Sequence, residues 1–191
     1  DAGGIDLTSL GGLPAARQAR VLRRWIAALN LPPLPARGVT RIRADLLTGG
    51  HDSQAQFAWA GAWVRRWRDR LYAGHDQPTL PADWRVQWDG RSALPLPGGG
   101  ELRLGGTDGF DALVIATARR GGERIALPGR AHSHSLKHVL QDLDVPPWTR
   151  ERLPLLLDSE GQLLAAGDVV ASAAFRSWLD VRDARLEWKR A

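Results

Sequence analysis

The chain has 191 residues, of which 43% are hydrophobic and 25% are charged, as in a globular protein with a sizeable core. It holds no cysteine, no apolar run long enough to cross a membrane and no secretory signal, which excludes disulfides, thiolate metal sites and membrane spans and favours a cytoplasmic protein. Methionine is also absent and the chain starts at Asp1, so we expect the C-terminal piece of a longer protein.

Positive charge is concentrated in the first part of the chain and is carried almost entirely by arginine. The formal net charge is +5, and only Lys137 and Lys189 are lysines. Residues 1–74 hold 11 arginines against 5 aspartates, a net charge of +6, whereas residues 75–191 have a net charge of −1. Because the planar guanidinium pairs with phosphate in two places, this excess favours a nucleic-acid partner; a merely solvated arginine surface is the alternative.

The first predicted element is a helix over residues 14–30. Its apolar stripe recurs at helical spacing and consists of Ala15, Ala19, Leu22, Ile26 and Leu29. Arg17, Arg20 and Arg24 fall on another face at spacings of three and four. Since like charges on one face repel, an anion bound there would stabilise the helix.

A second helix is predicted over about Gly38–Thr48, because its apolar residues also recur at helical spacing. The next letters, TGGHDS at 48–53, have the spelling of the PP-loop that holds ATP pyrophosphate in adenylating enzymes. Such a loop follows a buried strand, whereas Gly49 and Gly50 follow a helix and are typical of its stop signal. We therefore predict a helix end and a loop at 48–53, not an ATP site.

Residues 55–72 alternate between tryptophans and arginines and fit a period of two or of four. The density of tryptophan and the Ala60-Gly61 break favour a β-hairpin over a helix. Arg65, Arg66 and Arg68 interleave with the tryptophans, which suits stacking and phosphate contacts as well as a solvated basic face.

Short strands dominate the rest of the chain after a linker at 75–83, where small residues and prolines gather. Strands are expected in WRVQW, in hairpins around Gly98–Gly100 and Gly121-Gly122, beside a turn at Ser159–Gly161, and in the tail. Ser135 is a plausible N-cap for a short helix, and PPWTRERL forms a further helical turn.

These elements predict an α+β protein with two domains. The first, at 1–74, is a small all-α domain to which the hairpin is added. The second, at 84–191, is a β-rich, sandwich-like domain with short helices.

Three histidines, His132, His134 and His138, are spaced as H-x-H-x3-H, and the last two are expected on one helix face. No carboxylate accompanies the histidines at a fixed spacing, and the chain has no cysteine. A metal site, and with it a histidine-based metalloenzyme, is therefore the weaker interpretation. The neighbouring Arg130 and Lys137 favour a cationic patch that binds phosphate. A surface cluster without a binding role is the third alternative. We expect no metal ligand and no catalytic residue in this chain.

The stretch PGRAHSHSLKHVLQDLDVPPWTRERLPLLLDSEGQLLAAGDVV, residues 128–170, resembles the C-terminal substrate domain of bacterial tRNA(Ile)-lysidine synthetases. The family pattern is matched by Gly129-Arg130, Ser135-Leu136-Lys137, Gln141, Val145-Pro146-Pro147-Trp148, Arg150, Arg152 and Pro154-Leu155. His138 stands where the family has a second lysine. Upstream, LPAARQARVLRRWIAALN and WVRRWRDRLY are similar to the family's helical substrate domain.

The resemblance implies a parent enzyme that ligates lysine to the wobble cytidine, C34, of a tRNA(Ile) with a CAU anticodon, through an adenylated cytidine. ATP, Mg and L-lysine would bind an upstream PP-loop domain, so this segment needs no cofactor of its own and is predicted to be inactive alone. Its expected partner is the tRNA; whether the parent is a homodimer stays open. The alternative is a tRNA-binding appendage of another tRNA enzyme, such as a synthetase module.

We expect the tRNA to contact two patches. The first patch lies in the first domain and consists of Arg17, Arg20, Arg24, Arg65, Arg66 and Arg68. The second patch consists of Arg130, His134, Lys137 and His138. Trp148, which follows two prolines, is expected to pack in the core of the second domain.

Overall fold

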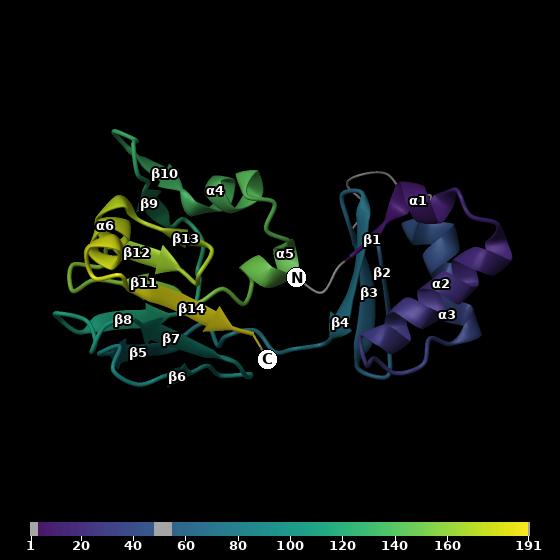
Figure 1. Ribbon diagram of the computed structural model, residues 1–191, viewed down its shortest axis with the longest axis horizontal. Coiled ribbons are helices and arrows are strands. Elements are labelled where there is room, and N and C mark those ends of the chain that lie inside the picture. Colours follow the sequence, from purple (N-terminus) through teal and green to yellow (C-terminus); the bar gives the residue numbers. More distant parts are fainter. Residues whose placement is uncertain (1–3, 48–54, 191) are drawn as a thin grey trace. The chain divides into compact units, whose positions relative to one another are not determined.

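The computed structural model describes residues 4–47 and 55–190, so the TGGHDS stretch at 48–53, predicted as a helix end and a loop, lies outside the described residues (Figure 1). The chain divides into two compact units, Asp1–Asp76 and Gln77–Ala191, and each has its own apolar core. Both units combine helices with antiparallel sheets, which confirms the α+β class. Among the described helices, none has the length and apolar character that a membrane span requires.

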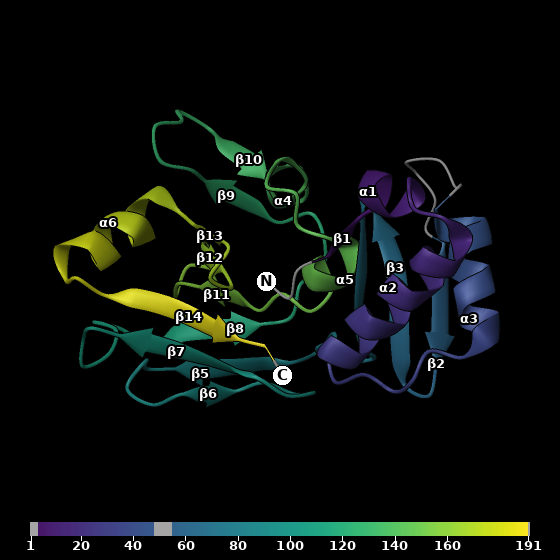
Figure 2. The same cartoon turned by 45° about the vertical axis from the view of Figure 1, so that its right-hand side comes forward.

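The first unit is a helical layer on one antiparallel sheet of strand order β1-β4-β3-β2 (Figure 2). Its helical segments are α1 (Leu7–Gly11), α2 (Ala15–Ala28), α3 (Ala36–Arg41) and a π-helical turn at Ile42–Leu46. Its strands are β1 (Ile5–Asp6), β2 (Gln56–Trp59), β3 (Ala62–Trp67) and β4 (Arg70–His75). The sheet makes this unit α+β itself, where the sequence analysis expected helices and one hairpin.

The favoured hairpin at 55–72 is confirmed by β2 and β3, which pair in register from Gln56 opposite Arg65 to Trp59 opposite Ala62. Ala60 and Gly61 connect them, both at positive φ (43° and 76°), as two-residue hairpin turns require. Alternation then gives the sheet two faces. Val64 and Leu71 are fully buried in the core with the helices, so Arg65, one residue on, points to the opposite face.

The second unit contains a five-stranded and a three-stranded antiparallel sheet that share one core, together with a two-stranded ribbon. The five-stranded sheet has the order β13-β12-β11-β8-β5. Its strands are β5 (Arg85–Trp88), β8 (Val114–Thr117), β11 (Leu155–Leu157), β12 (Leu163–Ala166) and β13 (Val170–Ala171). The expected turn at Ser159–Gly161 joins β11 to β12 and is confirmed.

The three-stranded sheet, of order β14-β7-β6, contains β6 (Leu94–Pro95), β7 (Glu101–Gly105) and β14 (Arg185–Lys189). Three helices complete the unit: α4 (Leu136–Asp142), α5 (Pro147–Arg150) and α6 (Ala173–Val181). The hairpin around Gly98–Gly100, the short helix after Ser135 and the final strand are confirmed. Neither α6 nor the short α1 was expected.

The hairpin predicted around Gly121-Gly122 is wrong. Strand β8 pairs with β5 and β11, whereas β9 (Arg124–Ala126) pairs with β10 (Ser133–Ser135) in the separate ribbon. The two glycines, at φ of 91° and 82°, turn the chain from one sheet to the next. A glycine pair between two apolar runs signals a turn but does not state which strands pair across it.

Two side-chain predictions in this unit are also wrong. His134 belongs to β10, because helix α4 begins only at Leu136, so His134 and His138 do not share a helix face. Trp148 is half-buried and is not part of the core cluster. Helix α5 is a single turn whose buried residue is Arg150, and Arg150 Nε donates to the Val145 carbonyl at 2.5 Å. Leu153, which follows the helix, is fully buried.

Candidate nucleic-acid interface

Helix α2 presents an arginine surface to solvent. It buries Leu22 and Ile26 in the core and leaves the three predicted arginines exposed. Arg23, which the sequence analysis overlooked, is exposed as well. Within the described part of the chain, no carboxylate or other acceptor bonds these guanidinium groups: Arg17, Arg20, Arg23 and Arg24. Uncompensated like charges on one helix raise the free energy of the folded unit and are relieved by a bound anion.

Arg65 lies on the other side of the sheet from the helices and is held by its neighbours. Its Nε donates to Gln56 Oε1 at 2.9 Å, and its guanidinium carbon lies 4.4 Å from the centre of the Trp63 ring. Its Nη2 is 3.9 Å from Asp76 Oδ1. Stacking on tryptophan fixes the plane of the guanidinium.

Arg66 ties parts of the first unit together. Its Nη1 donates to the Leu46 carbonyl at the end of the π-helical turn, at 3.1 Å, and its Nε donates to the Arg68 carbonyl at 3.0 Å. Arg68 is exposed in the β3–β4 turn at a φ of 51°. The structure therefore does not gather the first patch on one surface: the α2 arginines and Arg65 lie on opposite faces of the layer, and Arg66 has structural hydrogen bonds.

Two residues of the second patch, Arg130 and His134, line a groove of about 360 Å³ beside helix α4. This α4 groove is lined by Leu127, Pro128, Arg130, His134, Val139, Asp142, Leu143, Val169, Val170, Ala171 and Arg176. Arg130 and His134 thus lie together, while Lys137 and His138 are exposed on α4 but do not line the groove. Leu143, 51% exposed, adds apolar surface to it.

Arg176 contributes a further cation to the α4 groove from helix α6. It was missed because α6 was missed, although Ser172 is a recognisable N-cap that accepts from Phe175 N at 3.2 Å. The Arg130 and Arg176 guanidinium groups have no acceptor among residues 4–47 and 55–190. Asp142 is the carboxylate that lines the groove, so its cations exceed its acids.

The three histidines do not form a metal centre in the described structure. No group of three or more histidine, aspartate or glutamate side chains there is close enough to hold an ion. His132 precedes the ribbon strand β10, His134 lies within it, and His138 lies on helix α4.

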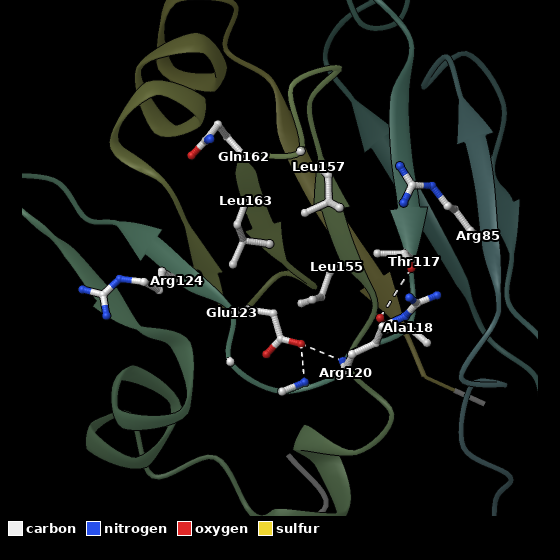
Figure 3. Close-up of a pocket in the computed structure, with 13 residues that line it drawn as sticks. Arg85, Thr117, Ala118, Arg120, Glu123, Arg124, Leu155, Leu157, Gln162 and Leu163 are labelled. Carbon is white, nitrogen blue, oxygen red and sulfur yellow. Dashed lines mark hydrogen bonds between the residues drawn. The ribbon is translucent and has the colours of Figure 1, made fainter.

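A second pocket, not foreseen from the sequence, lies between the five-stranded sheet and the turn that joins β8 to β9 (Figure 3). This β8–β9 pocket has a volume of about 410 Å³. Its lining residues are Arg85, Thr117, Ala118, Arg120, Gly121, Gly122, Glu123, Arg124, Leu155, Leu157, Gly161, Gln162 and Leu163. Arg85 reaches the pocket because β5 pairs with β8, which sets Arg85 opposite Thr117.

Glu123 organises the turn that walls this pocket. Its Oε1 accepts from the backbone N–H groups of Arg120 and Gly121, both at 2.6 Å, and its Oε2 lies 3.3 Å from Arg119 Nε. The Arg119 and Glu123 side chains are only 16% and 15% exposed. The carboxylate charge is therefore satisfied within the turn and leaves the other pocket cations uncompensated.

Comparison with known proteins matches both units to one family. A model of the TilS substrate binding domain matches residues 5–72, and a model of the TilS substrate C-terminal domain matches residues 114–188. The chain belongs to the tRNA(Ile)-lysidine synthase (TilS) family. The resemblance recognised in the sequence is thereby confirmed.

Two curated TilS relatives cover nearly all of the chain. It is 48% identical over 192 residues to the tRNA(Ile)-lysidine synthase of Xylella fastidiosa (strain 9a5c). This alignment covers 98% of this chain and 44% of that protein. The tRNA(Ile)-lysidine synthase of Xanthomonas campestris pv. campestris (strain 8004) is also 48% identical, with 100% of this chain and 44% of that protein covered. The chain therefore spans less than half the length of these relatives.

A solved structure, the crystal structure of the TilS C-terminal domain, aligns at a TM-score of 0.40 and 19% identity, over 56% of this chain and 97% of that one. The α2 arginines lie within the match to the TilS substrate binding domain, and the residues of the α4 groove lie within the match to the C-terminal domain. Arg85 of the β8–β9 pocket lies before residue 114, where the match to the C-terminal domain begins.

Proposed function

We propose that this chain is the tRNA-binding C-terminal part of a tRNA(Ile)-lysidine synthase. The observation that carries the proposal is the match of both units to substrate domains of that family. Exposed arginines without acidic partners support it, because phosphate contacts from arginine position a protein on RNA. The proposal also assigns domains to 1–74 and 84–191, joined by residues 75–83.

The parent enzyme would attach L-lysine to C34 of a tRNA(Ile) with a CAU anticodon, in the cytoplasm. ATP and Mg would serve an upstream catalytic domain, which first adenylates the cytidine; the lysine amine then displaces AMP. A single base cannot distinguish one tRNA from the others, so contacts with the body of the molecule are needed for selection. A-form RNA offers phosphates, 2′-hydroxyl groups and a shallow minor groove for such contacts.

Within this framework the two patches have different roles. The α2 arginines form a broad electrostatic surface suited to tracking a phosphate backbone. The α4 groove combines Arg130 and Arg176 with apolar walls, which suits a sugar–phosphate edge held in a fixed register. Lys137 and His138 extend the same positive surface along α4.

The second patch is tested by the double variant Arg130→Ala/Lys137→Ala, which removes one cation that lines the α4 groove and one that lies beside it on helix α4. We expect weaker binding of CAU-anticodon tRNA(Ile). The slope of log K against log salt should fall by up to about 1.4–1.8, since each phosphate contact that is removed lowers it by about 0.7–0.9. Fluorescence anisotropy at several salt concentrations measures both quantities, and circular dichroism confirms folding.

The matched control is Arg103→Ala/Lys189→Ala, which removes the same two charge types from neighbouring strands where both pair with Glu101. Equal losses in the two variants would indicate a general charge effect. An unchanged affinity and slope after Arg130→Ala/Lys137→Ala would remove the second patch from the tRNA surface and leave the arginines of the first unit.

The absence of catalysis in this chain is tested separately. Incubated with ATP, L-lysine and the tRNA, it should form neither lysidine nor AMP, and ATP should not raise its melting temperature, because a ligand that binds only the folded state must stabilise it. Turnover would overturn the assignment of this chain as a substrate-binding part. Binding of the tRNA with no upstream PP-loop domain in the parent gene would instead favour an appendage of another tRNA enzyme.

A further inference from the structure

We propose that the β8–β9 pocket holds one unpaired ribonucleotide of the bound RNA, with its phosphate at Arg85 and Arg120 and its base over the leucine floor. The inference rests on the proposed RNA-binding function but assigns a site that the two predicted patches do not include. Four features of the pocket carry it: two unpaired cations, an internally satisfied acid, an apolar floor and an uncommitted amide.

The cations come first. Arg85 leaves the edge of the five-stranded sheet and Arg120 leaves the β8–β9 turn, and Figure 3 shows both beside Thr117. Neither guanidinium has an acceptor among the described residues, and both arginines are exposed. Arg124 differs: it extends away from the other two in Figure 3, and its Nε donates to Ser133 Oγ at 2.9 Å. Two adjacent cations that lack a counter-ion form a site for a phosphate.

The acid in the pocket does not oppose an anion. Glu123 already accepts two backbone N–H groups and faces Arg119, so its charge is compensated inside the turn. The hydroxyl of Thr117 is also engaged, as it donates to the Trp84 carbonyl at 3.0 Å. The free hydrogen-bonding capacity of this wall therefore lies with the two arginines.

The floor suits the flat face of a base. Leu155, Leu157 and Leu163 lie between the arginines and Gln162 in Figure 3. The Gln162 backbone pairs with Asp158 across the β11–β12 turn, but its side-chain amide bonds no described residue. An amide offers one acceptor and two donors, which is the complement of a base edge.

Size and shape favour an unpaired nucleotide over a duplex. The volume of about 410 Å³ falls within the range of about 300–1,000 Å³ that accommodates small ligands. Bases in an A-form helix are stacked and cannot enter a pocket, whereas single-stranded nucleotides can be splayed out and read on their edges. The pocket therefore fits a nucleotide from a loop or an end of the RNA.

The test titrates the 191-residue chain with fluorescein-labelled r(A)5 and, in parallel, with a blunt-ended RNA duplex. The variant is Arg85→Ala/Arg120→Ala. Its control is Arg103→Ala/Arg185→Ala, which removes two arginines that pair with Glu101 and Glu187 on the other sheet. We expect the pocket variant to bind r(A)5 about tenfold more weakly, with a salt slope smaller by about 1.4, from about 0.7 per single-strand phosphate contact.

Binding of the duplex should change little in the pocket variant, and the control should bind both RNAs like the unmodified chain. Gln162→Leu should alter the order of affinities among r(A)5, r(C)5 and r(U)5 without changing the salt slope. Failure of the unmodified chain to bind r(A)5, or equal losses for r(A)5 and the duplex, would overturn the assignment of the pocket.

Parallel titration with the CAU-anticodon tRNA(Ile) separates this inference from the proposed function. A chain that binds the tRNA but not r(A)5 retains the proposed function and loses the pocket. A chain that binds r(A)5 through Arg85 and Arg120 but not the tRNA retains the pocket as a nucleotide site and loses the proposed function.

Discussion

The two units of the chain use arginine in different ways. The first unit contains no glutamate, and the four arginines of α2 are exposed without an acidic partner in the described structure. In the described part of the second unit, five arginines lie within salt-bridge distance of a carboxylate: Arg103, Arg119, Arg182, Arg185 and Arg190. Four other arginines line the β8–β9 pocket or the α4 groove, and their guanidinium groups have no acceptor among the described residues: Arg85, Arg120, Arg130 and Arg176.

Arginines that lack a carboxylate partner therefore mark a cationic surface better than the net charge of a unit does. Net charge alone would exclude the second part of the chain as a region that binds anions. Carboxylates neutralise arginines one by one, so a nearly neutral unit can still present cations wherever the acids lie elsewhere. The proposed interface therefore has a broad surface in the first unit and two small ones in the second.

The largest expected effect concerns the scaffold of the broad surface. Leu22→Ala should lower the free energy of unfolding of the first unit by about 2–5 kcal/mol, because Leu22 is fully buried where α2 meets the sheet. Val21→Ala is the control, since Val21 is 38% exposed on the same helix. Urea unfolding with a probe in each unit measures the loss. Equal destabilisation of both units by Leu22→Ala would contradict their description as separate cores.

A smaller loss of stability is expected when the carboxylate that pairs with an arginine of the second unit is removed. Glu123→Ala removes the acceptor of two backbone N–H groups and the partner of Arg119, which should cost about 1–3 kcal/mol. Glu187→Ala, whose partner Arg185 is 77% exposed, should cost at most about 1 kcal/mol. Thermal unfolding of both variants measures the difference; equal costs would mean that the turn does not depend on its carboxylate.

The third effect distinguishes binding from stability in the first unit. Arg17→Gln/Arg20→Gln/Arg24→Gln should weaken tRNA binding and reduce the salt slope by up to about 2.7, at about 0.9 for each phosphate contact. The same variant should unfold at equal or slightly higher denaturant concentration, because relief of like-charge repulsion is worth about 0.2–0.5 kcal/mol per pair. Lower stability together with unchanged tRNA affinity would make these arginines structural.

Local patterns in the sequence predicted much of this organisation. The apolar stripe found α2, because a helix of 14 residues repeats its period several times. Ala60-Gly61 found the β2–β3 hairpin, because positive φ at a two-residue turn restricts residue choice. Arg17, Arg20 and Arg24 were placed on an exposed face by the same periodicity that placed the core.

The two small surfaces depend on contacts between distant residues, and local patterns do not reveal these. Arg85 and Thr117 meet only because β5 pairs with β8. Arg130, between the two strands of the ribbon, and Arg176, on α6, are far apart in the sequence and line one groove only in the folded unit. Arg65 and Arg66, adjacent in the sequence, were assigned to one patch, yet strand alternation sends them to opposite faces.

The smallest expected effect is the pH dependence of one ion pair in the second unit. Asp111 accepts from Trp178 Nε1 at 2.7 Å and from Arg182 Nη2 at 2.8 Å. The hydrogen bond from Trp178, together with the Arg182 guanidinium, lowers the pKa of the Asp111 carboxyl below its ordinary value. A lowered pKa in the folded state means that ionised Asp111 stabilises the fold above the unfolded-state pKa of about 4, and that this contribution is lost as pH falls through the folded-state pKa.

Asp111→Asn should therefore lower stability at neutral pH and show a shallower loss of stability than the unmodified chain as pH falls below about 4. Asp108→Asn, an exposed aspartate in the same loop, serves as the control. Urea unfolding across this pH range measures the two slopes. Asp111 is exposed and Arg182 is half-buried, so the effect is small, but its sign is fixed by the direction of the pKa shift. A steeper acid loss in Asp111→Asn would show that Arg182 is not neutralised by this carboxylate, and Arg182 would then join the unpaired cations of the second unit.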